Sequence, residues 1–292
     1  MLKQQPINWL RPSNDFVFKL LFGSDDGVSK DLLLAFCNDL FNVPSGQSLV
    51  NIEILNPILN KGSITDKLAI LDVKARAVGY GFINLEMQVN NQKNIHKRSL
   101  YYASKLIEEQ MGEGEEYKKL KKVITINVMD FYYFSSDMYV NQFGLRGIRE
   151  SAVYPDDLIN IYFIEMPTFT DLAQDEKIHP NDRMAKWLRF LTNKDDTRWV
   201  EMAKQDPIIE KAINKLQRAS LDPETRMQYE AREKALKDIA SIRGEALEEG
   251  ALIKVQEIAK KLISKGMEIE FIAEMTGLSK SEVTKLKDEM GN

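Results

Sequence analysis

Cysteine and histidine are scarce in this chain of 292 residues, which has one cysteine, Cys37, and two histidines, His96 and His179. A single cysteine excludes an internal disulfide framework and is typical of a protein in a reducing cytosol. Two histidines are too few for a histidine-rich zinc site, and they make a serine–histidine triad a poor explanation of any activity. Catalysis by this chain is therefore expected to depend on carboxylates.

Long apolar segments are also missing. No apolar run approaches the roughly 18 residues that a transmembrane helix needs. Residues 1–16 contain no apolar core of a secretory signal. Both absences predict a cytoplasmic protein with no membrane partner.

Neither sign of charge dominates, because 40 Lys and Arg stand against 44 Asp and Glu, a net charge of −4. A molecule with this balance does not attract nucleic acid over its whole surface. Residues 93–122, however, hold eight basic side chains against five glutamates, a local net charge of +3. This segment is either a basic patch that could bind a polyanion or an ordinary charged helix face.

Helix and strand patterns alternate in the first half of the chain, which predicts an α/β fold. Apolar residues at helical spacing predict helices over 13–23, 29–41 and 98–111. Runs rich in β-branched residues predict strands over 49–55, 66–78, 82–89, 122–134 and 158–166.

The pattern changes after Pro167, beyond which almost no strand signal remains. We therefore expect a core over 1–167, a helical extension over 168–222 and a helical C-terminal region over 223–292. Residues 222–266 read as one long helix or two, because Gly244 and Gly250 each weaken a helix by about 1 kcal/mol.

The segment Ile83–Val89, INLEMQV, places Asn84, Glu86 and Gln88 on one face of a strand and apolar residues on the other. Such a polar face is either solvated or part of a site. A hairpin loop with an odd number of residues, centred on Gly79, would place Asp72 opposite Glu86. An even loop would place them on opposite faces of the sheet.

Two carboxylates that face each other across neighbouring strands repel unless a cation lies between them. Mg²⁺ suits this position, because it prefers oxygen ligands and retains several waters. We expect Asp72 and Glu86 to bind the metal with the backbone carbonyl of Met87, while Gln88 holds the attacking water.

The spacing Asp72–x13–Glu86–x–Gln88 resembles the PD-(D/E)xK nuclease superfamily, with Gln88 where that superfamily has its signature lysine. More narrowly, the chain resembles the Rpn family of recombination-promoting nucleases, also labelled transposases. The shared blocks are NDFVFKLLFG, LDVKARAVGYGFINLEMQV, RSLYYASKL, YKKLKKVITINVM and EIAKKLISKGMEIEFIAEMTGLSKSEVTKL. The ordered set of blocks is much more specific than the short motif.

The resemblance implies a restriction-endonuclease-like core, which is a mixed sheet flanked by helices, followed by an all-α C-terminal region. It implies Mg²⁺-dependent DNA cleavage in a bacterial cell, with Mn²⁺ or Ca²⁺ able to substitute in binding. A role in recombination, DNA exchange or phage defence is implied as well. Asp15 would be the superfamily's additional acidic residue, or simply a carboxylate that interacts with a helix dipole.

Several side chains could contact the phosphates of DNA. Lys19 lies one turn after Asp15, although it is equally explained as a solvated side chain. Because Gln88 carries no charge, Lys67 or Lys74 could compensate for the missing lysine. Arg98 could bind a phosphate through two hydrogen bonds, and Tyr102 could stack or donate to the DNA backbone, whereas Tyr101 reads as a core residue.

The C-terminal segment contains two short helix patterns joined at residues 276–279, which is typical of a helix-turn-helix. Residues 251–292 hold seven acidic and seven basic side chains, so the segment has no basic footprint. We therefore expect these helices to assemble a homo-oligomer rather than to read bases.

Three functions follow from the sequence. The first is a metal-dependent DNA endonuclease. The second is a DNA-binding module on the same fold that has lost cleavage, as the glutamine at the lysine position suggests. The third is an oligomeric scaffold, which does not exclude the first.

Overall fold

The structure is a computed structural model that describes residues 7–42, 48–59, 70–91, 93–147, 157–179, 181–193 and 196–290. The chain divides into two compact units at Tyr229 and Glu230.

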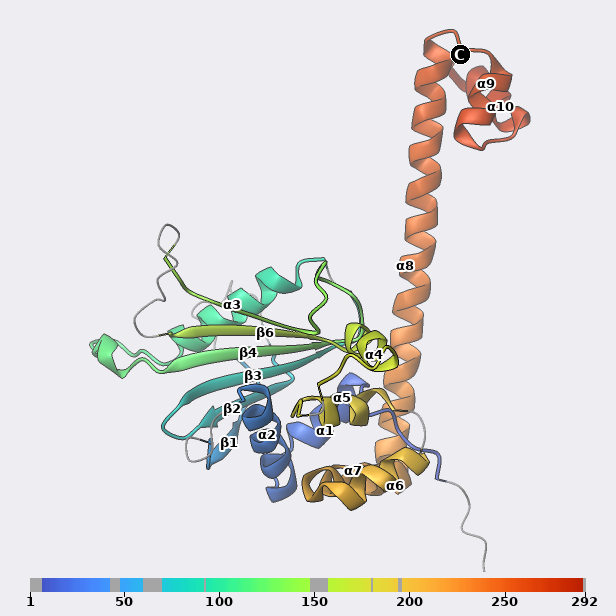
Figure 1. Cartoon of the computed structure of the whole chain (residues 1–292). Coiled ribbons are helices and arrows are strands. Elements are labelled where there is room, and N and C mark those ends of the chain that lie inside the picture. The colour runs from blue at the N-terminus through green and yellow to red at the C-terminus, as the bar shows by residue number, and fades with distance from the viewer. Residues whose placement is uncertain are drawn as a thin grey trace, which may run out of the picture. The chain divides into compact units, whose positions relative to one another are not determined.

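A mixed sheet of six strands forms the centre of the first unit, with the order β1-β2-β3-β4-β6-β5 within the described part of the chain (Figure 1). The strands are β1 (Ile52–Leu55), β2 (Val73–Ala77), β3 (Gly81–Gln88), β4 (Lys122–Met129), β5 (Val140–Gly144) and β6 (Ile159–Glu165). The β3–β4 and β4–β6 pairs are parallel, and the other three pairs are antiparallel. The predicted α/β class with a mixed sheet is confirmed.

Helices cover both faces of the sheet (Figure 1). Helix α3 (Ile95–Glu108) lies on the face that carries Phe82 and Val123, where Ala103 and Leu106 are buried. The opposite face packs against helices from both ends of the unit. They are α1 (Asp15–Phe22), α2 (Gly27–Leu40), α5 (Ala185–Thr192) and α7 (Pro207–Leu221). The remaining short helices of this unit are η1 (Tyr117–Lys119), α4 (Met166–Gln174) and α6 (Asp196–Gln205).

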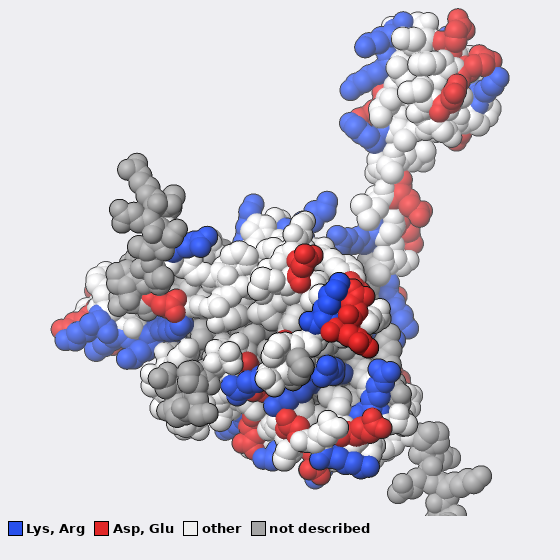
Figure 2. Space-filling model, in the orientation of Figure 1, with Lys and Arg blue, Asp and Glu red and all other residues white. Residues whose placement is uncertain are grey.

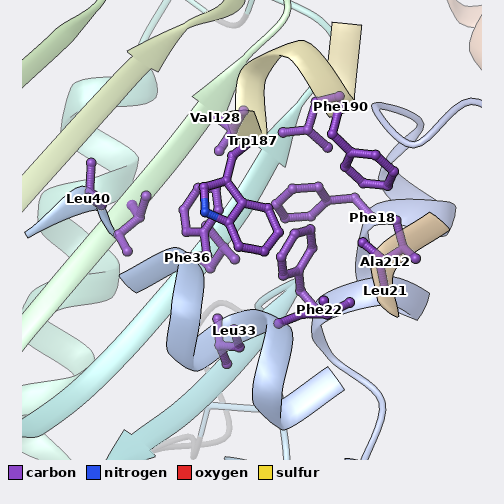
Figure 3. Close-up of a cluster of buried hydrophobic side chains, with 14 of the residues drawn as sticks. Phe18, Leu21, Phe22, Leu33, Phe36, Leu40, Val128, Trp187, Phe190 and Ala212 are labelled. Carbon is purple, nitrogen blue, oxygen red and sulfur yellow. The ribbon is translucent and has the colours of Figure 1, made fainter. Parts of the chain in front are cut away.

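Trp187 of α5 is the centre of an aromatic cluster in the main core (Figure 3). Its ring centroid lies 5.8 Å from that of Phe22 and 5.5 Å from that of Phe36. Its Nε1 donates to Asp39 Oδ2 at 2.9 Å, which satisfies an indole N–H that burial would otherwise leave unpaired. The helices that the sequence placed in a separate extension over 168–222 thus share one core with the sheet.

The hairpin between β2 and β3 has the odd loop on which the predicted site depends. Val78, Gly79 and Tyr80 connect Ala77 to Gly81, which are opposite each other in the ladder. Gly79 has φ = 75°, a conformation that glycine adopts at little cost. The predicted register is therefore confirmed.

Some predicted boundaries are wrong. The strand predicted over 122–134 ends at Met129, because Met129 is the last residue with a partner in both β3 and β6. Strand β5 was not predicted, since its edge position leaves it partly exposed and its sequence VNQFG lacks an apolar alternation. The strand predicted over 66–78 includes β2 only at Val73–Ala77, and residues 60–69 lie outside the described residues.

The second unit is helical, as predicted. Helix α8 (Pro223–Ser264), which belongs to the second unit from Glu230 onward, is a single helix of 42 residues, and this decides between the two alternatives for 222–266. Its end packs with α9 (Ile269–Thr276) and α10 (Lys280–Met290) around a small core of Ala259, Ile272, Leu278, Val283 and Leu286. No helix in the described part of the chain is long and apolar enough to cross a membrane.

The turn between α9 and α10 has the geometry that its sequence predicts. Gly277 ends α9 with φ = 74°. The Ser279 hydroxyl accepts from the Glu282 N–H at 3.3 Å, and the Glu282 carboxylate accepts from the Ser279 N–H at 2.8 Å. This reciprocal pair is a capping box, so Ser279 is the N-cap of α10 as expected.

Gly23 fixes the position of α1 against the sheet. A Cβ atom on this residue would lie 2.9 Å from the Lys19 carbonyl oxygen and 3.0 Å from Cγ2 of Val73. The end of α1 can therefore approach the start of β2 only because residue 23 has no side chain.

We expect Gly23→Ala to lower the free energy of unfolding by roughly 1–3 kcal/mol, because the added methyl group forces α1 away from β2. Urea denaturation of the purified protein measures this change. Gly27→Ala is the matched control, since a Cβ there meets no atom within 4 Å. Equal stability of the two variants would contradict the steric argument.

Candidate active site

Two carboxylates face each other where β2 begins beside β3. The ladder pairs Val73 with Leu85, so Asp72, one residue earlier, lies opposite Glu86. Glu86 Oε1 accepts a hydrogen bond from the Asp72 backbone N–H at 3.2 Å. Asp72 Oδ2 accepts one from the Met87 backbone N–H at 2.9 Å. Each carboxylate is thus held by the backbone of the opposite strand.

The Met87 carbonyl completes a set of oxygen atoms at this point. The Met87 N–H points toward the β2 side of β3, because it donates to Asp72. In a strand the N–H and C=O of one residue point to the same neighbour. The Met87 carbonyl oxygen therefore lies on the same side as the Asp72 carboxylate.

Gln88 and Arg98 extend the cluster toward α3. Gln88 Nε2 donates to Glu86 Oε2 at 3.1 Å, and the Arg98 guanidinium donates to Gln88 Oε1. Arg98 also lies over the Tyr102 ring, with Cζ 5.9 Å from the ring centroid. A chain of hydrogen bonds thus connects a cation on α3 to a buried carboxylate on β3.

Helix α1 brings a third carboxylate and a lysine close to Asp72. Asn14 is the N-cap, and its side chain accepts from the N–H groups of Phe16 and Val17 at 3.0 and 3.4 Å. Asp15 is therefore the first helical residue, and Lys19 follows one turn later on the same side. Asp15 raises the pKa of Asp72 and Lys19 lowers it, which places both charges within electrostatic range of that carboxylate.

Burial raises the pKa values of both facing carboxyls, and a neighbouring carboxylate adds to each increase, Asp72 acting on Glu86 and Asp15 acting on Asp72. Burial is the largest cause for Glu86, followed by the charge of Asp72, and together they raise its pKa to about 8. Burial also raises the pKa of Asp72. The positive charge of Arg98 lowers the pKa of both carboxyls and so opposes both increases.

Burial likewise raises the pKa of Tyr102, with a further contribution from the charge of Glu86. The Tyr102 hydroxyl therefore remains protonated and is a hydrogen-bond donor beside the site.

Lys74 does not reach this cluster. Its Nζ lies 2.5 Å from Glu109 Oε2, and both side chains are nearly buried, at 10% and 13% exposure. The expectation that Lys74 contacts DNA or replaces the missing lysine stays a prediction, and the ion pair with Glu109 does not support it. Lys67, the alternative, lies outside the described residues.

The polar residues of β4 were not among the predicted site residues. Asn127 lies beside Glu86 in the ladder and accepts from the Ser99 hydroxyl at 2.8 Å, which fixes α3 to the sheet. Thr125 lies beside Asn84, and both residues are fully buried. The sequence could have indicated these residues, because the polar residues of ITINVM alternate with apolar ones just as those of INLEMQV do.

The donor set suits a hard divalent cation. Asp72, Glu86 and the Met87 carbonyl offer oxygen atoms only, and two raised carboxyl pKa values indicate a site in which added positive charge is favourable. Within the described residues, no group of three or more Asp, Glu, His or Cys side chains could hold a metal. Asp15 therefore lies near the pair without forming a three-carboxylate cluster.

A mixed sheet flanked by helices, with facing acidic residues at the end of one hairpin, is the restriction-endonuclease-like fold of nuclease-type hydrolases. Comparison with protein families agrees. Residues 12–246 match the model described as PD-(D/E)XK nuclease family transposase. Because the match covers more than half of the chain, the protein belongs to this family.

The end of the chain has a match of its own. Residues 252–288 match the model described as Rpn/YhgA-like nuclease family, C-terminal HTH domain. This result confirms the suspected Rpn resemblance and the helix-turn-helix pattern. No curated protein and no solved structure matches the chain.

The raised pKa of Glu86 predicts a pH dependence for the metal-free protein. Between the ordinary value of 4.5 and about 8, the folded state holds a proton on Glu86 that the unfolded chain has released. The folded state thus binds more protons, so the free energy of unfolding falls as the pH rises through this window. We expect a loss on the order of 3 kcal/mol between pH 5 and 8 in EDTA.

Thermal unfolding of wild type and Glu86→Gln at several pH values measures this dependence. The glutamine variant should show a flatter profile, because it cannot release the proton. Glu210→Gln, an exposed position on α7, is the control and should keep the wild-type slope. Parallel profiles for wild type and Glu86→Gln would show that Glu86 does not titrate in this range.

Proposed function

We propose that this protein is a Mg²⁺-dependent DNA endonuclease that hydrolyses phosphodiester bonds. The observation that carries the proposal is the pair Asp72 and Glu86, which face each other with the Met87 carbonyl beside them. These three groups would hold the metal, and Mn²⁺ or Ca²⁺ could replace Mg²⁺ in binding. When bound, the metal would supply Lewis-acid activation of water and of the scissile phosphate.

The side chains around the pair have distinct roles in this proposal. Gln88 orients the attacking water, because its amide is both a donor and an acceptor. Its present partners, Glu86 and Arg98, hold the amide at the edge of the carboxylate pair. Asp15 adds negative charge next to Asp72, which strengthens the attraction for a divalent cation.

DNA contacts would come from three side chains close to the pair. Lys19 is exposed and lies within electrostatic range of Asp72, so it can approach a phosphate next to the scissile one. Arg98 offers the planar guanidinium that binds phosphate oxygens in pairs. The Tyr102 hydroxyl adds a neutral donor. Lys74 has no part in this group, because Glu109 already binds its ammonium.

Arg98 has a second part in the proposal, because it supplies the charge that the missing lysine would provide. It lowers the pKa of both carboxyls, and its hydrogen bond to Gln88 points that charge at the water-holding position. The superfamily's lysine function would thus be shared between a neutral amide on β3 and a guanidinium on α3.

The C-terminal unit would provide additional DNA binding through its helix-turn-helix, in line with the family model that matches it. Homo-oligomerisation through the C-terminal helices is a separate part of the proposal, which light scattering on the full chain and on a chain ending at residue 250 would test. A role in recombination, DNA exchange or phage defence would follow from the breaks that the enzyme makes.

The central test is nicking of supercoiled plasmid with Mg²⁺, with EDTA as the blank. Asp72→Asn and Glu86→Gln should abolish nicking, because each removes a proposed metal ligand. Gln88→Ala should lower the rate by roughly 10²–10⁴-fold and leave metal binding intact, since positioning effects have this size. Equal nicking by wild type and Asp72→Asn would assign the activity to a contaminant. No nicking by wild type with any divalent metal would favour the binding module.

The role of Arg98 can be separated from plain DNA binding. Arg98→Met should lower the nicking rate by about 10²-fold, comparable to the loss of one charge-stabilising group. The double variant Arg98→Met/Gln88→Lys should recover much of this loss, because it restores a cation at the family's lysine position. If the double variant is no faster than Arg98→Met, Arg98 acts on the substrate rather than in place of the lysine.

A further inference from the structure

A large cleft in the first unit is distinct from the candidate active site, because its lining includes none of the residues assigned to that site. Its volume is about 1070 Å³, above the 300–1,000 Å³ that is typical of small-molecule sites. It lies between the segment before α1, the end of β4, and helices α4, α5 and α6. An open cleft of this size suits a length of polymer better than a compact metabolite.

Three arginines line the cleft, and they come from three different parts of the chain. Arg11 precedes α1, Arg189 lies on α5 and Arg198 lies on α6. All three are exposed, and none forms an ion pair with another residue in the part of the chain that the structure describes. Figure 2 shows Lys and Arg side chains on the surface where Figure 1 places α5.

The rest of the lining fits a nucleic acid strand. Hydroxyl and amide side chains, among them Ser13, Thr170 and Gln205, add neutral hydrogen-bonding groups to the rim. Phe169 and Met166 lie at the base and are almost fully buried, so the floor is apolar. A charged rim above an apolar floor can bind phosphates and at the same time cover sugars or bases.

Two residues that line the cleft belong to segments that also carry residues of the candidate active site. Ser13 directly precedes Asn14, the N-cap of α1, and is two residues before Asp15. Asp130, on the other wall, donates its backbone N–H to the Gln88 carbonyl at 2.9 Å. The start of α1 and the paired ends of β3 and β4 thus contribute to both the cleft and the candidate active site.

We propose that this cleft binds a single-stranded stretch of DNA next to the scissile phosphate, with Arg11, Arg189 and Arg198 as its phosphate contacts. The inference rests on the proposed nuclease function and specifies how its substrate is held. Guanidinium groups suit this role, because they remain charged and bind phosphate oxygens through two parallel hydrogen bonds. Asp130 and Glu201 on the rim limit the net attraction, so affinity would depend on the three arginines.

The test measures binding without cleavage. Fluorescence anisotropy of a labelled single-stranded 12-mer is recorded in EDTA with the full chain carrying Asp72→Asn. Adding Arg11→Gln, Arg189→Gln and Arg198→Gln together should weaken binding at least 30-fold. It should also reduce the slope of log affinity against log salt by about 2, because each neutralised phosphate of a single strand contributes roughly 0.7 to that slope. A duplex of the same sequence should lose much less affinity.

Arg218→Gln is the matched control, because Arg218 is exposed on α7 outside this cleft. An equal loss from this single change, or an unchanged salt slope in the triple variant, would overturn the proposal. Photo-cross-linking with a 5-iododeoxyuridine 12-mer gives a second answer, since cross-links should fall in residues 7–13 and 185–205. Cross-links confined to residues 252–288 would assign the single-strand binding to the helix-turn-helix.

The experiments distinguish a failure of the cleft proposal from a failure of the nuclease proposal. If wild type fails to nick plasmid while the arginine variants lose binding, the cleft is correct and catalysis is not. If wild type nicks plasmid while the triple variant binds the 12-mer as wild type does, the nuclease proposal stands and the cleft proposal fails.

Discussion

The odd hairpin loop between β2 and β3 is the constraint on which the candidate site depends. Because side chains alternate along a strand, one residue more or less in the loop would move Asp72 to the other face of the sheet, away from Glu86. Gly79 permits the three-residue loop, since it adopts φ = 75°. The register in turn allows each carboxylate to accept a hydrogen bond from the opposite strand.

The rest of the first unit supports that one point. Helix α3 carries Arg98 to Gln88 and is fixed to β4 through Ser99 and Asn127. Helix α1 carries Asp15 and Lys19 to Asp72, and Gly23 permits its close approach to β2. The aromatic core around Trp187 joins α1 and α2 to α5, so helices distant in sequence form one support under the sheet.

This arrangement gives a physical reason for glutamine at the lysine position. Lysine at residue 88 would be placed beside Glu86 and close to Arg98, so two cations would compete for one partly buried region. Glutamine avoids this repulsion, since its amide donates to the carboxylate and accepts from the guanidinium. The positive charge of the candidate site then comes from Arg98 on α3 and not from residue 88 on β3.

The sequence alone determined the α/β class and the helical second unit, because both follow from local periodicity. It predicted that Asp72 faces Glu86 only if the hairpin loop is odd, and the structure shows that the loop is odd. It could not determine that Lys74 is bound by Glu109, that Arg98 contacts Gln88, or that residues 168–222 share the main core. Nor could it locate the arginine cleft, whose residues span positions 11 to 205. Those features depend on contacts between segments distant in the chain, and only the packing of helices on the sheet decides which side chains meet there.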